Sequence, residues 1–248
     1  MSSEMEQCRR ISKARARLLL NAPFWGHLAL HLQPVAKTGL AAGTLATDGT
    51  NLYYDPEGAM KDWSDDELLF AVAHETGHCA FGHLWRKESR DFMRWNFATD
   101  FAINDLLNKE GFTAPKMCLL DPKFSDMSAE YIYTQLPENN TTTVYVSLDD
   151  PDIWKEVTEG KQPGQGKGED GEDEEDGQDG GTPGKDDKDG KGQGKNNPQK
   201  SEQYWKDIVV SAANNAKMQG KLPAHLDHLI KDLLAPKLDW RELLRDYI

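Results

Sequence analysis

The sequence has few cysteines and no long apolar run. Its three cysteines, Cys8, Cys79 and Cys118, are far apart among 248 residues, and an odd number without a CxxC pair does not form a disulfide framework. No stretch approaches the roughly 18 apolar residues of a membrane span, and residues 1–7 lack the apolar region of a signal peptide. We therefore expect a cytoplasmic protein in a reducing compartment, with no membrane partner.

The sequence also has fewer basic than acidic residues. The chain has 29 Lys and Arg residues against 42 Asp and Glu residues, which gives a formal net charge of −13 at pH 7. Residues 160–200 contribute −4 of this charge, so the remainder of the chain still carries −9. Because this sign of charge repels a phosphate backbone, we expect no nucleic-acid partner.

Large apolar side chains are absent from residues 160–200, which nevertheless hold 12 of the 21 glycines. Such a segment cannot offset the entropy cost of ordering, so we predict a disordered, acidic, Gly-rich linker at 159–200. Its acidic run lacks the ligand spacing of an EF-hand calcium loop, but a protein partner could bind through it. The linker separates a core at 1–158 from C-terminal helices at 201–248, which we expect to pack back on the core.

The rest of the chain predicts a mainly helical α+β fold with a small antiparallel β-hairpin. The hairpin is expected at 43–54, where two β-prone runs flank an Asp-Gly turn. Two long helices are predicted, one at 64–85 that begins with a capping box between Ser64 and Glu67, and one at 89–109. Further helices are predicted at 5–20, 24–33, 128–136, 201–219 and 223–247, and a strand at 142–147.

The residues from His74 to His78 have the sequence His-Glu-Thr-Gly-His. On a helix, two positions four residues apart project only about 40° from one another, so both imidazoles can bind one tetrahedral zinc ion. Glu75 lies to one side, where it can take a proton from the water that a catalytic zinc carries. The pattern therefore predicts zinc ligands at His74 and His78, and a catalytic base at Glu75.

A third ligand is predicted on the following helix. At 100° per residue, Asp100 is centred on an apolar face, and a buried carboxylate is costly unless it is paired or binds a metal. Asn96 and Asn104 flank Asp100 and can form hydrogen bonds that orient a ligand. We predict that Asp100 is the third zinc ligand; a buried salt bridge to an arginine such as Arg86 or Arg90 is the alternative.

Three other histidines and one cysteine lie outside the predicted ligand set. On an unbroken helix His83 points 180° from the first histidine of the motif, so it reaches the metal only if Gly82 breaks the helix. Cys79 projects about 100° from the second histidine and is excluded on the same geometry. His225 and His228 are expected to be surface or packing residues.

The sequence also offers candidate residues for the part of the site that would face a substrate. Attack of a zinc-bound water on a carbonyl also needs a group that stabilises the oxyanion, and Tyr131 and Tyr133 are the candidates, although their spacing points them to different faces. Residues 50–54 could offer a strand edge to an extended peptide.

Several segments, in their order along the chain, resemble those of a known family: DGTNLYYDPE, WSDDELLFAVAHETGHCAFGHLWR, RWNFATDFAIND, SAEYIYTQL and PKLDWRELLRDYI. That family is the metallopeptidase domain that precedes a von Willebrand factor A-like domain in bacterial and phage proteins. The resemblance implies a zincin-like fold, zinc ligands at His74 and His78, Glu75 as the catalytic base and Asp100 as the third ligand.

Two functions of different classes follow from this sequence. The favoured one is zinc-dependent hydrolysis of a peptide or protein substrate, and the alternative is a non-catalytic, zinc-stabilised protein-binding module. Glu75 separates them, because a purely structural zinc site prefers four protein ligands and has no use for a glutamate beside its first histidine.

Overall fold

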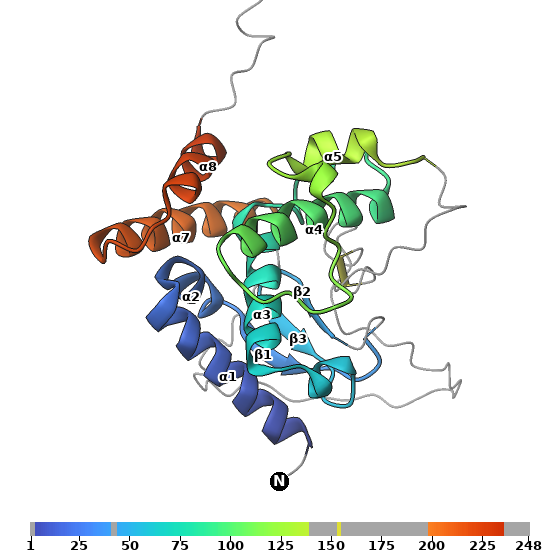
Figure 1. The fold of residues 1–248 in the computed structure, drawn as a ribbon, viewed down its shortest axis with the longest axis vertical. Coiled ribbons are helices and arrows are strands. Elements are labelled where there is room, and N and C mark those ends of the chain that lie inside the picture. Colours follow the sequence, from blue (N-terminus) through green and yellow to red (C-terminus); the bar gives the residue numbers. More distant parts are fainter. Residues whose placement is uncertain (1–2, 41–43, 139–152, 155–197, 236–248) are drawn as a thin grey trace, which may run out of the picture.

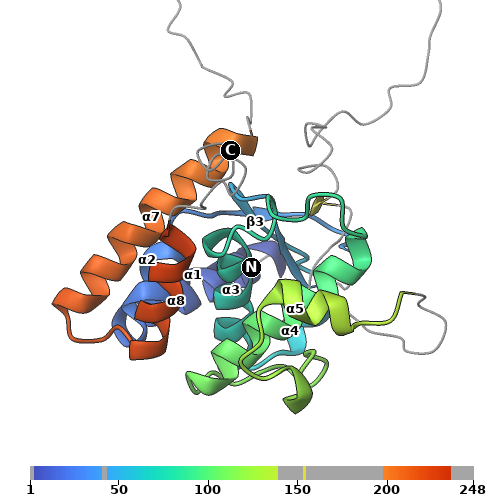
Figure 2. The ribbon, with the colours of Figure 1, turned by 90° about the horizontal axis from the view of Figure 1, so that it is seen from above.

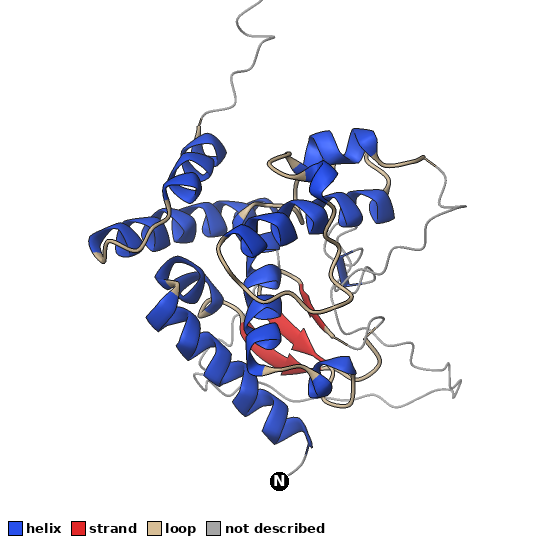
Figure 3. Cartoon of the chain, viewed as in Figure 1, coloured by secondary structure: helices blue, strands red, loops and turns tan. Residues whose placement is uncertain are grey.

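The protein is mainly helical, with one small sheet (Figures 1 and 3). The computed structural model describes residues 3–40, 44–138, 153–154 and 198–235. Within this part of the chain there are seven α-helices and a three-stranded mixed sheet. The predicted mainly helical α+β fold is therefore confirmed.

Helix α3 (Asp65–Ala80) is the central element of the fold. It packs against α1 (Ser3–Asn21), α2 (Pro23–Ala29), α4 (Phe92–Lys109) and the sheet. Figure 2 shows α1 and α2 on one side of α3 and α4 on the other. Because neighbours surround it, every residue of α3 from Phe70 onward is buried.

The two ends of α3 have different causes. At its start the predicted capping box is present, since the Ser64 hydroxyl accepts from the Glu67 N–H at 3.2 Å and the Glu67 carboxylate accepts from the Ser64 N–H at 2.8 Å. Its end corrects our prediction of a helix reaching residue 85. The helix stops at Ala80 because Gly82 has a φ of +66°, a left-handed conformation that suits glycine and reverses the chain.

The sheet contains the predicted hairpin and one further strand. Strands β2 (Leu45–Thr47) and β3 (Asn51–Tyr54) pair antiparallel, and β1 (Gln33–Ala36) pairs with β3 in parallel. The prediction of a helix over 24–33 was wrong at its end, because α2 ends at Ala29 and the chain then extends into β1. The order β1-β3-β2 makes β3 the central strand. Residues 51–54 therefore have neighbours on both sides, and the predicted free edge at 50–54 was wrong.

The C-terminal helices lie against the N-terminal part of the chain. Helix α7 (Pro198–Met218) contacts α2 and α3, and α8 (Ala224–Leu234) contacts α7. The buried indole of Trp205 donates a 2.8 Å hydrogen bond to the carbonyl of Gly49 in the hairpin turn. Helix α7 therefore helps to hold the hairpin turn in place.

Short elements connect the long ones: η1 (Ala59–Asp62), η2 (Pro122–Phe124) and α5 (Ala129–Gln135). Several predicted features lie outside the described residues, namely the strand at 142–147, nearly all of the linker at 159–200 and the end of the last helix beyond 235. In the described part of the chain, none of the helices combines the length and apolarity needed to cross a membrane.

Candidate metal centre

The predicted ligands come from two packed helices. His74 and His78 lie one turn apart on α3, and Asp100 lies on α4. Gly77 allows the two helices to approach closely, since a Cβ at this position would lie only 3.2 Å from the Cδ1 of Ile103 on α4. The absence of a side chain at Gly77 therefore helps to bring Asp100 to the histidines.

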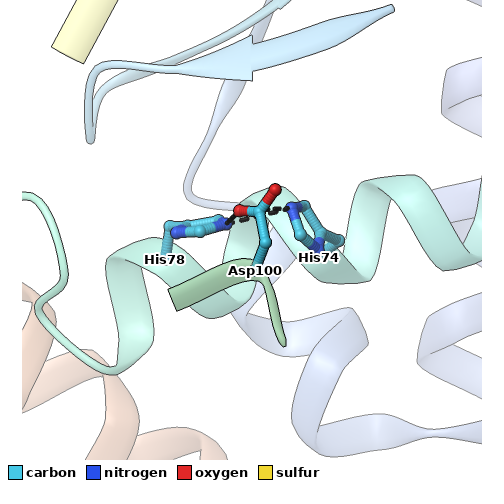
Figure 4. A group of neighbouring side chains, drawn as sticks. All are labelled: His74, His78 and Asp100. Atoms are coloured by element: carbon cyan, nitrogen blue, oxygen red, sulfur yellow. Dashed lines mark hydrogen bonds and ion pairs between the residues drawn. The ribbon is translucent and has the colours of Figure 1, made fainter. Parts of the chain in front are cut away.

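The three side chains converge through one atom each (Figure 4). The Nε2 atoms of His74 and His78 are 3.0 Å apart, and the Oδ1 of Asp100 is 3.7 and 3.5 Å from them. A triangle with these sides has a circumscribed radius of about 2.0 Å, close to the roughly 2.0–2.1 Å bonds of zinc to imidazole nitrogen and carboxylate oxygen. The donor set and its spacing therefore fit a metal ion of this size.

This group of side chains is fully buried. The side chains of His74, His78 and Asp100 are all 0% exposed, and uncompensated polar groups are costly at such depth. The two arginines that could have neutralised Asp100 are engaged elsewhere. Arg86 forms an ion pair with Glu130, and the guanidinium of Arg90 lies over the ring of Trp95.

The ring of His74 is oriented by Asn104, one turn beyond Asp100 on α4. The Oδ1 of Asn104 is 2.7 Å from the Nδ1 of His74, while the Nδ2 of Asn104 donates to the carbonyl of Leu119 at 3.0 Å. Because the amide nitrogen is used by Leu119, the amide oxygen faces the imidazole and Nδ1 is the donor. In the neutral ring, Nε2 then carries the lone pair that a metal ligand needs.

The ring of His78 also packs against an aromatic side chain from a distant segment. Trp154 packs against it edge to face, with ring centroids 4.6 Å apart, and Trp154 also contacts Phe92 at the start of α4. Sequence reasoning missed Trp154, because its distance from the motif along the chain gives no signal that it belongs to the site.

His83 does not follow the unbroken-helix geometry, because α3 ends before it. The chain turns at Gly82, and the Nδ1 of His83 lies 3.4 Å from the Nδ1 of His78. This contact is on the side of the His78 ring away from Nε2, so His83 is beside a predicted ligand without being a member of the converging group.

Glu75 is buried in α3 beside the first histidine, with 1% of its surface exposed. The converging group of ligand atoms consists of His74, His78 and Asp100 and does not include the Glu75 carboxylate. This placement matches a base better than a fourth ligand, while the catalytic role itself stays a prediction.

The remaining predicted residues lie elsewhere. Tyr131 is 53% exposed on α5. The Tyr133 hydroxyl accepts a hydrogen bond from the N–H of Asp91. Asp91 precedes Asp100 by nine residues, which corresponds to about 13 Å along the helix. The structure favours neither tyrosine as the oxyanion partner.

The two C-terminal histidines and the cysteine are engaged in packing and surface contacts. His225 pairs with Glu110, His228 pairs with Asp232, and the thiol of Cys79 lies 3.5 Å from the hydroxyl of Thr47 on β2. The contacts of the two histidines agree with their predicted surface and packing roles.

The fold and the site together define a mainly helical α+β protein with a buried His-His-Asp group that could hold a metal ion. The chain belongs to the family described as "Putative metallopeptidase domain", whose sequence profile matches residues 6–248. Comparisons with curated proteins and with solved structures gave no match.

Proposed function

We propose that this protein is a zinc-dependent hydrolase of peptide bonds. His74, His78 and Asp100 hold the ion, and Glu75 acts as the general base. The observation that carries the proposal is the convergence of two Nε2 atoms and one carboxylate oxygen at 3.0–3.7 Å from one another. Three protein ligands leave a fourth position of a tetrahedral site open, which is typical of catalytic zinc.

Each ligand has a defined task at such a site. His74 and His78 present neutral nitrogens, and Asp100 supplies the negative charge that offsets part of the cation's charge in a buried environment. When bound, zinc supplies Lewis acidity, which lowers the pKa of a water molecule and polarises a substrate carbonyl.

Glu75 supplies the proton transfers. It follows a ligand directly on α3 and is itself buried, so its carboxylate can take a proton from the attacking water and pass it to the leaving amine. A peptide substrate is supported by membership of the metallopeptidase family, since the His-Glu-Thr-Gly-His site alone does not define which amide is cleaved.

A zinc-stabilised binding module is the second candidate. The complete burial of the three ligands favours it, because structural zinc sites are closed to solvent whereas catalytic sites must admit substrate. Two observations favour catalysis: Glu75 is buried, and among the residues that the structure describes no fourth ligand joins the converging group.

Metal analysis and turnover together test the proposal. Plasma mass spectrometry on the chain purified with added zinc should give about one zinc per chain, and Asp100→Ala should lose most of it. Mass spectrometry of a peptide library should then detect cleavage by the wild type. Glu75→Gln should keep its zinc but cleave about 10²–10⁴-fold more slowly.

Asp66→Asn is the matched control for Glu75→Gln, because it removes an exposed carboxylate from the same helix. It should leave both zinc content and cleavage unchanged. A wild type without zinc would overturn the metal site. If the wild type binds zinc but cleaves no peptide, and Glu75→Gln leaves the zinc content unchanged, the protein is a binding module instead.

A further inference from the structure

The end of α3 ties the backbone of His83 to that of His78. Phe81 caps the helix and Gly82 adopts a left-handed conformation, so the chain turns back on the last helical turn. The N–H of Gly82 donates to the carbonyl of Cys79 at 3.1 Å, and the N–H of His83 donates to the carbonyl of His78 at 2.9 Å. This is the pair of hydrogen bonds of a Schellman motif, which ends many helices.

The motif also places the two side chains together. In a Schellman motif the residue after the glycine donates its N–H to a carbonyl in the last turn of the helix. The side chains of these two residues often pack together, and they are usually apolar. Here both residues are histidines, with ring centroids 5.3 Å apart and ring planes at 71°. His83 is 3% exposed, and its carbonyl accepts from the indole of Trp95 on α4 at 3.0 Å. Both backbone polar groups of His83 are thus fixed.

We propose that His83 is a positioning residue for His78 at the metal site, an inference that rests on the proposed function. The Nδ1 of His83 faces the Nδ1 of His78 at 3.4 Å, whereas the Nε2 of His78 faces His74 and Asp100. When Nδ1 of His78 donates to His83, its Nε2 carries the lone pair and points to the metal.

His83 therefore serves His78 as Asn104 serves His74. Each ligand histidine is supported at Nδ1 by a buried side chain, so that both rings present Nε2 to one point. The two supports come from different parts of the fold, since Asn104 lies on α4 and His83 lies on the turn that ends α3. The helix stop at Gly82 is thereby linked to the geometry of the metal site.

Zinc affinity of position-83 variants tests this role. Phe at position 83 keeps a ring against His78 but removes the acceptor nitrogen, and Asn keeps an acceptor near the position of Nδ1. We expect His83→Phe to bind zinc about 10–100-fold more weakly than the wild type in competition with a chromogenic chelator. His83→Asn should recover most of the affinity, and His228→Phe, on the exposed face of α8, should have no effect.

Two further measurements separate positioning from packing. The melting temperature of the metal-free protein should be similar for the wild type and His83→Phe, and the cobalt-substituted variant should show an altered visible absorption spectrum. If His83→Phe bound zinc as tightly as the wild type, the inference would be overturned while the metal site itself would stand. Equal losses of affinity in the Phe and Asn variants, with equal losses of metal-free stability, would assign His83 to packing. A wild type that binds no zinc would overturn the metal site, and this inference with it.

Discussion

Asn104 accepts a 2.7 Å hydrogen bond from the ring of His74 while it donates a 3.0 Å bond to the carbonyl of Leu119. The two contacts together fix the orientation of the amide. Its nitrogen donates to the carbonyl of Leu119, so its oxygen remains to accept from the imidazole. Removing this amide leaves the Nδ1 proton of a buried ring without its acceptor.

Asn104→Leu should therefore weaken zinc binding about 10–100-fold, because outer-shell hydrogen bonds orient the ligand ring. Isothermal titration of the metal-free protein with zinc measures this change. Asn108→Leu is the matched control, since Asn108 lies one turn further along the same helix and is exposed. Equal affinities in the wild type and the Asn104 variant would contradict the orienting role.

Metal removal should destabilise the folded protein. If zinc binds the assembled group and not the unfolded chain, as we propose, a free zinc concentration 100-fold above the dissociation constant should add about 2.7 kcal/mol to the free energy of unfolding. Thermal melts with zinc and with EDTA measure the difference. Asp100→Ala should show little response to either treatment, and a wild type that melts alike under both conditions would argue against a metal bound at this site.

Gly77→Val should destabilise the protein by about 1–3 kcal/mol and also weaken zinc binding. Even a Cβ at this position would be 3.2 Å from Ile103, so a branched side chain pushes α4, which carries Asp100, away from α3. Denaturant unfolding measures the stability, and zinc titration measures the site.

Ile103→Ala in the Gly77→Val background tests the cause. If the two side chains compete for one space, the double variant should be more stable than the sum of the single effects predicts, with a coupling of about 0.5–3 kcal/mol. Additive effects would place the origin of the destabilisation outside the α3–α4 contact.

Because of Glu110, the free energy of unfolding should fall as the pH rises from about 4 towards 7. Burial raises the pKa of its carboxyl group, and hydrogen bonds from Trp25 and His225 only partly oppose this rise. In the window between the unfolded and the raised folded pKa the native state holds more protons than the unfolded state, so stability is lost as the pH passes through the folded pKa.

Glu110→Gln removes the titrating group and keeps an acceptor for the Trp25 indole. The variant should match the wild type at pH 4 and exceed its unfolding free energy at pH 7, as measured by denaturant titration at both values. His225 is 48% exposed, so its pairing with Glu110 adds little against this change. A variant that is less stable than the wild type at pH 7 would show that the ion pair outweighs the cost of burial.

The local geometry of the metal motif was accessible from the sequence because it depends on one helix. A spacing of four residues brings His74 and His78 to the same face of any α-helix, and the capping box from Ser64 to Glu67 specifies where that helix begins. Asp100 could be predicted for a related reason, since a carboxylate centred on an apolar helix face needs a partner.

Only the tertiary structure decided how these local pieces meet. The packing of α4 on α3 at Gly77 determines that Asp100 faces the two histidines, and the left-handed turn at Gly82 returns His83 to His78. Trp154 reaches the same ring from a distant segment. Periodicity specifies which residues share a face of one helix, whereas the distances between side chains of different segments depend on how the whole core packs.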